Sequence, residues 1–173
     1  HVALVSEQTI PNILSIYHQK PDSLLFISTK QMQAKAKIPA ILKTLSMLKM
    51  SYEGKDLDTL VVEEDALLDI CREIDRWVMG KEDSQFLVNI TCGTKIMSLA
   101  AYESFRNYNS SIIYIPIKKN EFITEFPQTS AEKRIPLALR LGVLEYLQAY
   151  GLGVANESRQ KDFRDYADKS KYL

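Results

Sequence analysis

Apolar residues in this 173-residue chain gather in short continuous runs, and longer segments of mixed polarity separate them. A continuous apolar run bounded by polar or turn residues is typical of a strand that is buried on both faces of a sheet. The runs predict strands at residues 2–5, 24–27, 59–62, 86–90, 112–117 and 121–126, of which the last is expected to be antiparallel.

The segments between the runs carry apolar residues at spacings of three and four, which is the pattern of a helix with one buried face. They predict helices at residues 13–17, 31–50, 64–79, 95–108 and 136–150. Pro39 is expected to kink the second of these helices, because proline removes a backbone donor. Strands and helices that alternate with short connections predict an α/β fold. We expect it to be Rossmann-like and doubly wound, with a mostly parallel sheet and helices on both faces.

The composition is that of an ordinary globular domain, with 46% hydrophobic and 25% charged residues. No apolar run approaches the roughly 18 residues of a membrane span, and the polar residues that follow residue 5 are unlike a secretory signal. Two cysteines are too few for a disulfide framework or a zinc knuckle. We therefore expect a cytoplasmic domain with no membrane contact, no metal and no cofactor.

Positive and negative residues number 22 each, so the formal net charge is zero. This balance excludes a polycation that binds nucleic acid by bulk charge alone, and no direct DNA binding is expected. The charges are unevenly spread, because residues 53–83 hold 11 acidic residues against 4 basic ones and the remainder is basic. Solvated helix faces would explain this segregation, and so would a basic side that attracts an anionic ligand.

The ends of the predicted strands matter because ligands of doubly wound folds bind outside the carboxyl ends of the strands. Three of these ends, at residues 6–12, 28–30 and 89–95, are rich in hydroxyls and amides rather than carboxylates. The third places Gly93, two threonines and Lys95 at the start of a predicted helix. Free backbone N–H groups, the helix dipole and a lysine favour an anion there, and glycine lets the backbone approach it closely.

The same residues have a plainer interpretation, because threonine caps helices widely. Helix capping and phosphate binding thus both stay open from the local motif. The sequence holds neither the Gly-x-x-x-x-Gly-Lys-Ser/Thr phosphate loop nor the Gly-x-Gly-x-x-Gly dinucleotide fingerprint. These absences argue against a Walker-type NTPase and against a nicotinamide or flavin oxidoreductase.

Other reactive residues give weaker evidence of a functional site. Cys92 stands at a predicted helix start, where a thiol pKa is lowered, so it is a candidate nucleophile. No histidine neighbours it in sequence, and a loop-filling role is the simpler interpretation. His18 is the only internal histidine, which leaves no Cys/His metal cluster. Residues 63–65 are acidic and could bind magnesium, or they begin a helix whose dipole favours acidic residues. No residue is assigned a catalytic role.

Two motifs resemble a known family. Residues 89–101 read Asn-Ile-Thr-Cys-Gly-Thr-Lys-Ile-Met-Ser-Leu-Ala-Ala, which resembles the Asn-Ile-Thr-Gly-Gly-Thr-Lys-x-Met-x-x-Ala signature of CARF domains, the CRISPR-associated Rossmann-fold sensors. Residues 4–12 resemble the first motif of the branch that is usually fused to a C-terminal nuclease, and residues 25–29 also fit. The family has glycine where this chain has Cys92, so either the loop differs slightly or that position does not need glycine.

The resemblance implies a homodimer whose two-fold axis passes through a shared pocket for a cyclic oligoadenylate, most specifically cyclic tetra-adenylate (cA4). Binding would control an attached effector in type III CRISPR antiviral signalling. The resemblance assigns ligand contacts to Ser6, Gln8, Thr9, Asn12, Thr29, Lys30, Asn89, Thr91, Cys92, Gly93, Thr94 and Lys95. It implies a CARF ligand-binding domain at residues 1–135 and a C-terminal helix and polar linker at 136–173, so the chain is either cut from a larger protein or a standalone sensor.

An enzyme is the alternative. Some similar domains resemble ring nucleases, in which a ribose 2′-OH attacks the adjacent phosphate without a metal. Ser6, Thr94 and Lys95 could stabilise the charge of that reaction. The lack of a histidine that could serve as a general base weakens this hypothesis.

Overall fold

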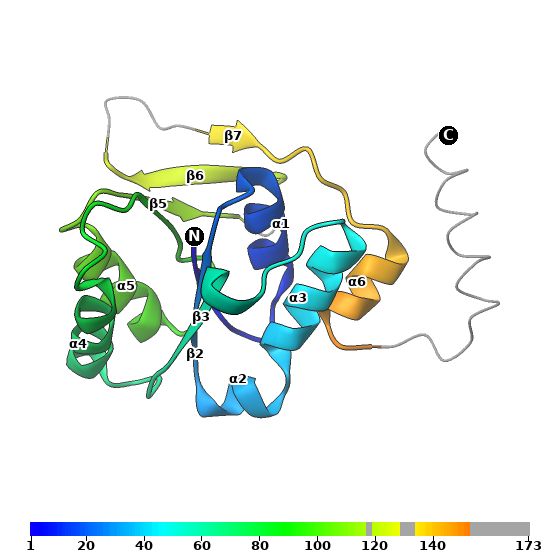
Figure 1. Ribbon diagram of the computed structural model, residues 1–173. Helices are drawn as coiled ribbons and strands as arrows, with labels where there is room; N and C mark the ends of the chain where they lie inside the picture. The colour runs from blue at the N-terminus through cyan, green and yellow to red at the C-terminus, as the bar shows by residue number, and fades with distance from the viewer. Residues whose placement is uncertain (117–118, 129–133, 153–173) are drawn as a thin grey trace.

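The computed structural model describes residues 1–116, 119–128 and 134–152. Within these ranges seven strands form one sheet in the order β3-β2-β1-β4-β5-β6-β7 (Figure 1). The strands are β1 (Val2–Leu4), β2 (Leu24–Ser28), β3 (Leu57–Val61), β4 (Phe86–Asn89), β5 (Ser110–Tyr114), β6 (Glu121–Phe126) and β7 (Arg134–Pro136). The first five are parallel, and β6 and β7 are antiparallel, so the expected Rossmann-like α/β fold is confirmed.

Helices cover both faces of the sheet (Figure 1). They are α1 (Ile10–Gln19), α2 (Lys30–Ala34), α3 (Lys37–Met47), α4 (Leu67–Val78), α5 (Lys95–Phe105) and α6 (Val143–Ala149), with a 3-10 turn at Gly54–Asp56. Successive residues of a strand point to opposite faces. Leu4 accordingly joins the apolar core under α4 and α5, whereas Val5 joins the core under α1 and α3. This double burial explains the continuous apolar runs of β1 and β2, whereas β3, at the edge of the sheet, is largely exposed although its run predicted a buried strand.

Two parts of the chain differ from the expectation. The helix expected at residues 31–50 is two helices, α2 and α3, separated at Ala36, which has φ 50°. Pro39 lies in the first turn of α3, where its missing N–H has no intrahelical partner to lose, so the break comes before it rather than at it. The helix expected at 136–150 is also shorter, because the chain first pairs with β6 as β7 and α6 begins only at Val143. The predicted polar linker, from residue 153 onward, lies outside the described residues.

The strand order places a switch point between β1 and β4. From β1 the chain proceeds to β2 and β3 on one side, and it returns to form β4 and β5 on the other. The crevice between the two diverging connections is where ligands bind in this class of fold. The described part of the chain holds no helix with both the length and the apolar character to cross a membrane.

Candidate functional site

The connection between β4 and α5 is a tight loop at the carboxyl edge of the sheet. Gly93 has φ +82°, and a Cβ atom at this position would lie 3.0 Å from the Cβ of Leu4 in β1. Glycine is the residue that tolerates both this backbone angle and this close approach. Thr94 then caps α5, because its Oγ1 accepts a hydrogen bond from Met97 N at 3.2 Å. The same hydroxyl donates to Glu64 O at 2.9 Å. The capping interpretation of Thr94 is confirmed, and phosphate binding stays a prediction.

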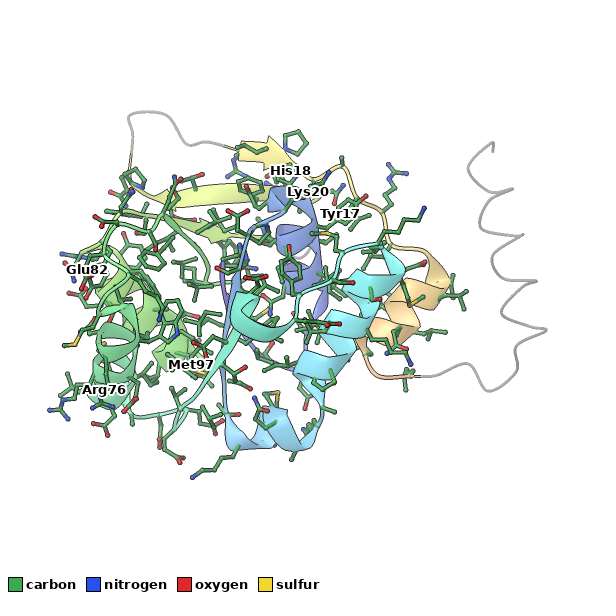
Figure 2. The ribbon with its side chains drawn as sticks, in the orientation of Figure 1. Tyr17, His18, Lys20, Arg76, Glu82 and Met97 are labelled. Atoms are coloured by element: carbon green, nitrogen blue, oxygen red, sulfur yellow. The ribbon has the colours of Figure 1, made fainter. Side chains whose placement is uncertain are left out.

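Helix α5 is held by its inner face. Met97 is fully buried in the core under α4 and α5, and Figure 2 shows it beside the sheet. Ser98 donates from Oγ to Ile90 O at 3.1 Å and to Cys92 O at 3.3 Å, which folds the loop back onto the helix. The start of α5 is therefore rigidly placed next to the switch point.

A buried asparagine pair joins the end of β4 to α1. Asn89 and Asn12 have no solvent exposure. Asn89 Nδ2 donates to Asn12 Oδ1 at 3.1 Å and to Pro11 O at 3.3 Å. Its Oδ1 accepts from the backbone N and from Oγ1 of Thr91, at 3.1 and 2.5 Å. Asn12 Nδ2 donates to Leu4 O at 2.8 Å. These amides hold the ends of β1 and β4 in one fixed arrangement.

The loop after β1 contacts the loop after β4. Ser6 Oγ accepts from Gln8 N at 3.2 Å, which forms a tight turn. Cys92 Sγ donates to Gln8 O at 3.1 Å. Thr9 is fully buried, and its Oγ1 donates to Ala149 O at 2.5 Å. The structure thus brings two of the three predicted strand ends together and ties the first of them to α6.

The third strand end, after β2, lies beside β3. Thr29 caps α2 by accepting from Met32 N at 3.3 Å. Lys30 Nζ lies 2.6 Å from Glu63 Oε1, and this hydrogen bond raises the pKa of the lysine. The positive charge of Lys30 is therefore already paired with the carboxylate of Glu63. Within the described ranges no three His, Cys, Asp or Glu side chains gather as a metal site, so the magnesium interpretation of residues 63–65 gains no support.

Cys92 does not have the environment of a nucleophile. The residue is 3% exposed, and burial raises the pKa of its thiol from 9.0 to about 12. This shift is opposite to the lowering expected at a helix start, so the thiol stays protonated at neutral pH and fills the loop. The non-glycine residues described with positive φ are Lys20, Ala36 and Lys49. The position of Cys92 therefore does not need the glycine found in the family signature.

The raised pKa of Cys92 predicts a specific loss of stability at high pH. The unfolded thiol loses its proton near pH 9 and the folded thiol keeps it to about pH 12. Unfolding therefore releases a proton between these values, and rising pH favours it. We expect the parent to lose about 1.4 kcal/mol relative to Cys92→Ala between pH 8 and pH 10. Urea titrations followed by the fluorescence of Trp77, the single tryptophan, measure this, and equal losses in both proteins would contradict it.

The twelve predicted ligand-binding residues differ in their exposure to solvent. Gln8, Lys30 and Lys95 are exposed, Ser6, Thr91, Gly93 and Thr94 are partly exposed, and Thr9, Asn12, Thr29, Asn89 and Cys92 are buried. Lys95 forms no ion pair with any carboxylate of the described residues. An unneutralised cation thus stands at the start of α5, directly after the glycine loop.

Sequence reasoning missed a cavity of about 440 Å³ beside the loop after β1. It is lined by Gln8, Ile10, Pro11, Leu14, Ile115, Pro116, Lys119, Asn120, Tyr146 and Tyr150. Of these, only Gln8 was a candidate. The two tyrosines come from α6 and its C-cap, more than a hundred residues after β1 in sequence. Helical spacing revealed that helix, but it does not reveal which loop the helix packs against.

His18 lies away from these loops. It stands near the end of α1, at the opposite edge of the sheet, as Figure 2 shows. Its ring packs edge-on against Phe122, with 5.2 Å between ring centroids. The described site therefore has no histidine.

Solved structures share this fold. Can2 from Sulfobacillus thermosulfidooxidans, solved in complex with cA4, matches with a TM-score of 0.73 and 22% identity over 95% of this chain and 44% of its own. Protein VC1899 from Vibrio cholerae matches with a TM-score of 0.72 and 16% identity, over 87% and 39% of the two chains. Csm6 from Enterococcus italicus, solved with cyclic hexa-2′-fluoro-hexa-dAMP, matches with 0.53 and 12%, over 68% and 33%. The chain spans less than half the length of each.

Comparison with the curated proteins finds no significant match. The family model of the Card1 CARF domain, in contrast, matches residues 1–146, which include every loop of the candidate site. The motifs at residues 4–12 and 89–101, the strand order and the switch point agree with that match. The chain belongs to the Card1 CARF domain family.

Proposed function

We propose that this chain is a sensor domain that binds a cyclic oligoadenylate, most specifically cA4, in type III CRISPR antiviral signalling. One observation carries the proposal: the cation of Lys95, which forms no ion pair with the described carboxylates, follows Gly93 and Thr94 directly, at the start of α5 and at the switch point. Backbone N–H groups of the first helical turn lack intrahelical partners, and with the lysine they suit a phosphate. The Card1 CARF family and the cA4 complex of Can2 support this choice of anion.

The exposures divide the candidate residues by role. Lys95 and the backbone around Gly93 are open to hold a phosphate, and Ser6 and Gln8 are open to reach ribose hydroxyls. The buried Asn12 and Asn89 use their amides to hold the loops in place. We assign to this buried pair a positioning role rather than a ligand contact.

A homodimer would give the ring two equivalent sites. Leu99 lies one helical turn after Lys95 on α5 and is 53% exposed, so an apolar side chain stands open beside the proposed phosphate site. A second copy that covers Leu99 across a two-fold axis would bring two Lys95 side chains to one two-fold symmetric ring. We therefore expect one ring for every two chains, with allosteric control of an effector as the output.

A sensor fits the described site better than a ring nuclease does. Cleavage by a ribose 2′-OH benefits from a general base near the reacting hydroxyl. The thiol of Cys92 is buried and protonated, and His18 lies at the other edge of the sheet. We therefore propose binding rather than turnover.

The Lys95→Ala variant tests the proposal. We expect it to bind cA4 at least about 100-fold more weakly, because the ring would lose one charge-assisted hydrogen bond to each of two Lys95 side chains and each contributes about 1.5–3 kcal/mol. Calorimetric titration at one fixed salt concentration measures affinity and stoichiometry together. Lys43→Ala is the matched control, because Lys43 is exposed on α3 and its loss removes the same charge elsewhere. Equal affinity of Lys95→Ala and the parent would refute the assignment.

A further inference from the structure

Helix α6 is tied to the loop after β1 by a buried hydrogen bond. Thr9 and Ala149 both have no solvent exposure, and Thr9 Oγ1 donates to Ala149 O at 2.5 Å. The acceptor is a carbonyl in the last turn of α6, where helical carbonyls lack intrahelical partners. Removal of the hydroxyl would leave that carbonyl buried and unsatisfied. The bond therefore links the position of α6 to the position of the loop.

A second tie runs through Lys37. Its side chain is almost buried, and Nζ lies 3.1 Å from Glu7 Oε2 and 5.9 Å from the ring centroid of Tyr150. Glu7 also pairs with Lys35, and these two hydrogen bonds lower the pKa of the carboxylate. Lys37 thus holds the loop after β1 with one contact and the C-cap of α6 with the other.

The loop after β1 contacts α6 through Thr9 and carries Gln8, an exposed candidate for ligand contact. Gln8 lies between Glu7 and Thr9, and its carbonyl accepts from Cys92 in the loop after β4. Gln8, Tyr146 and Tyr150 line the same cavity of about 440 Å³. A ligand that contacted Gln8 would lie next in sequence to Thr9, which contacts α6 directly, and to Glu7, which contacts Lys37.

We infer that Thr9 and Lys37 couple ligand binding at the loop after β1 to the docking of α6, so that a ligand that orders the loop also tightens α6. This inference rests on the proposed function, because cA4 is the ligand that would order the loop. Coupling of this kind requires no large displacement: a loop that fluctuates less holds its hydrogen-bond partner longer. Helix α6 is then the element that reports occupancy of the site to the chain that continues beyond it.

Amide hydrogen exchange of the 173-residue chain, measured in the absence of ligand, tests whether Thr9 and Lys37 stabilise α6. The reporting amides are those of Tyr146, Tyr150, Gly151 and Leu152, which are hydrogen-bonded within or just after α6. We expect Thr9→Val to speed their exchange about tenfold, since a buried carbonyl loses its donor, and Lys37→Met to speed it about threefold.

Thr44→Val is the matched control for the ligand-free experiment. Thr44 is also fully buried and donates from Oγ1 to a helical carbonyl, Ala40 O at 2.8 Å, but within α3. Its substitution is expected to change exchange in α6 less than twofold. Equal acceleration of α6 by Thr9→Val and Thr44→Val would overturn the inference, and so would no acceleration by either.

The second arm adds cA4 at a concentration that saturates each protein. We expect exchange in α6 of the parent to slow about fivefold, and the slowing to be lost in Thr9→Val. Exchange in α6 that stays unchanged or speeds up in the saturated parent overturns the coupling. If the parent does not bind cA4, the proposed function fails, and the ligand-free comparison still decides whether Thr9 holds α6.

Discussion

Replacement of Asn89 by alanine is expected to lower the free energy of unfolding by about 3–4 kcal/mol. The side chain has no solvent exposure and makes four hydrogen bonds, to Asn12, to Pro11 and twice to Thr91. Alanine fills less of the space and leaves the amide oxygen of Asn12 and the backbone N–H of Thr91 without these partners. Buried groups that lose their partners cost more than the bonds themselves contribute.

Urea titration followed by Trp77 fluorescence measures this loss, and Asn107→Ala is its control. Asn107 is exposed and donates from Nδ2 to Glu103 O at 2.9 Å, so its substitution removes a side-chain bond that water can replace. We expect a change below about 0.5 kcal/mol there. Similar losses in the two variants would show that the buried amide pair does not stabilise the switch point.

Replacement of Gly93 by alanine is expected to cost about 3 kcal/mol and to disorder the proposed phosphate loop. Part of the cost, about 1 kcal/mol or more, comes from φ +82°, which an L-residue adopts poorly. The rest comes from the new Cβ, 3.0 Å from the Cβ of Leu4 in a fully buried strand that cannot move aside freely.

Gly80→Ala separates the two contributions to this cost. Gly80 has a similar φ of +79°, but a Cβ there would meet nothing within 4 Å. Urea titration of both variants should therefore give a loss of about 1 kcal/mol for Gly80→Ala and a clearly larger one for Gly93→Ala. If the two losses are equal, close approach to β1 is not the reason for glycine in this loop.

The parallel strands could be predicted because their signal is local. A strand buried on both faces is apolar at most of its positions, and the run from Leu24 to Ile27 shows this directly. Strand β7 could not be predicted, because Arg134, Ile135 and Pro136 are all exposed and form no pattern. Only their pairing with β6 makes them a strand. The break at Ala36 could not be predicted either. A proline in the first turn of a helix does not fix the residue at which the helix begins, and Pro39 lies in the first turn of α3.

The candidate site also has a part that local sequence predicts and a part that it does not. The glycine, the threonine cap and the lysine at residues 93–95 act within a few residues of one another, so their sequence order already indicates a loop that begins a helix. Which of the other candidates face solvent depends on contacts between distant segments. Asn12 and Asn89 meet across 77 positions, and Thr9 meets Ala149 across 140.

The sequence by itself therefore determined the fold class, the position of the glycine loop and the family signature, because each rests on apolar runs or on neighbouring residues. Only the tertiary structure decided that Asn12, Asn89 and Thr9 are buried and that Cys92 is a protonated filler with a raised pKa. It also decided that α6 packs against α3 and accepts a hydrogen bond from Thr9 in the loop after β1. The physical reason is that burial and hydrogen-bond partners are properties of packed segments. Local periodicity predicts which face of an element is apolar, and it does not predict which distant polar group that face will cover.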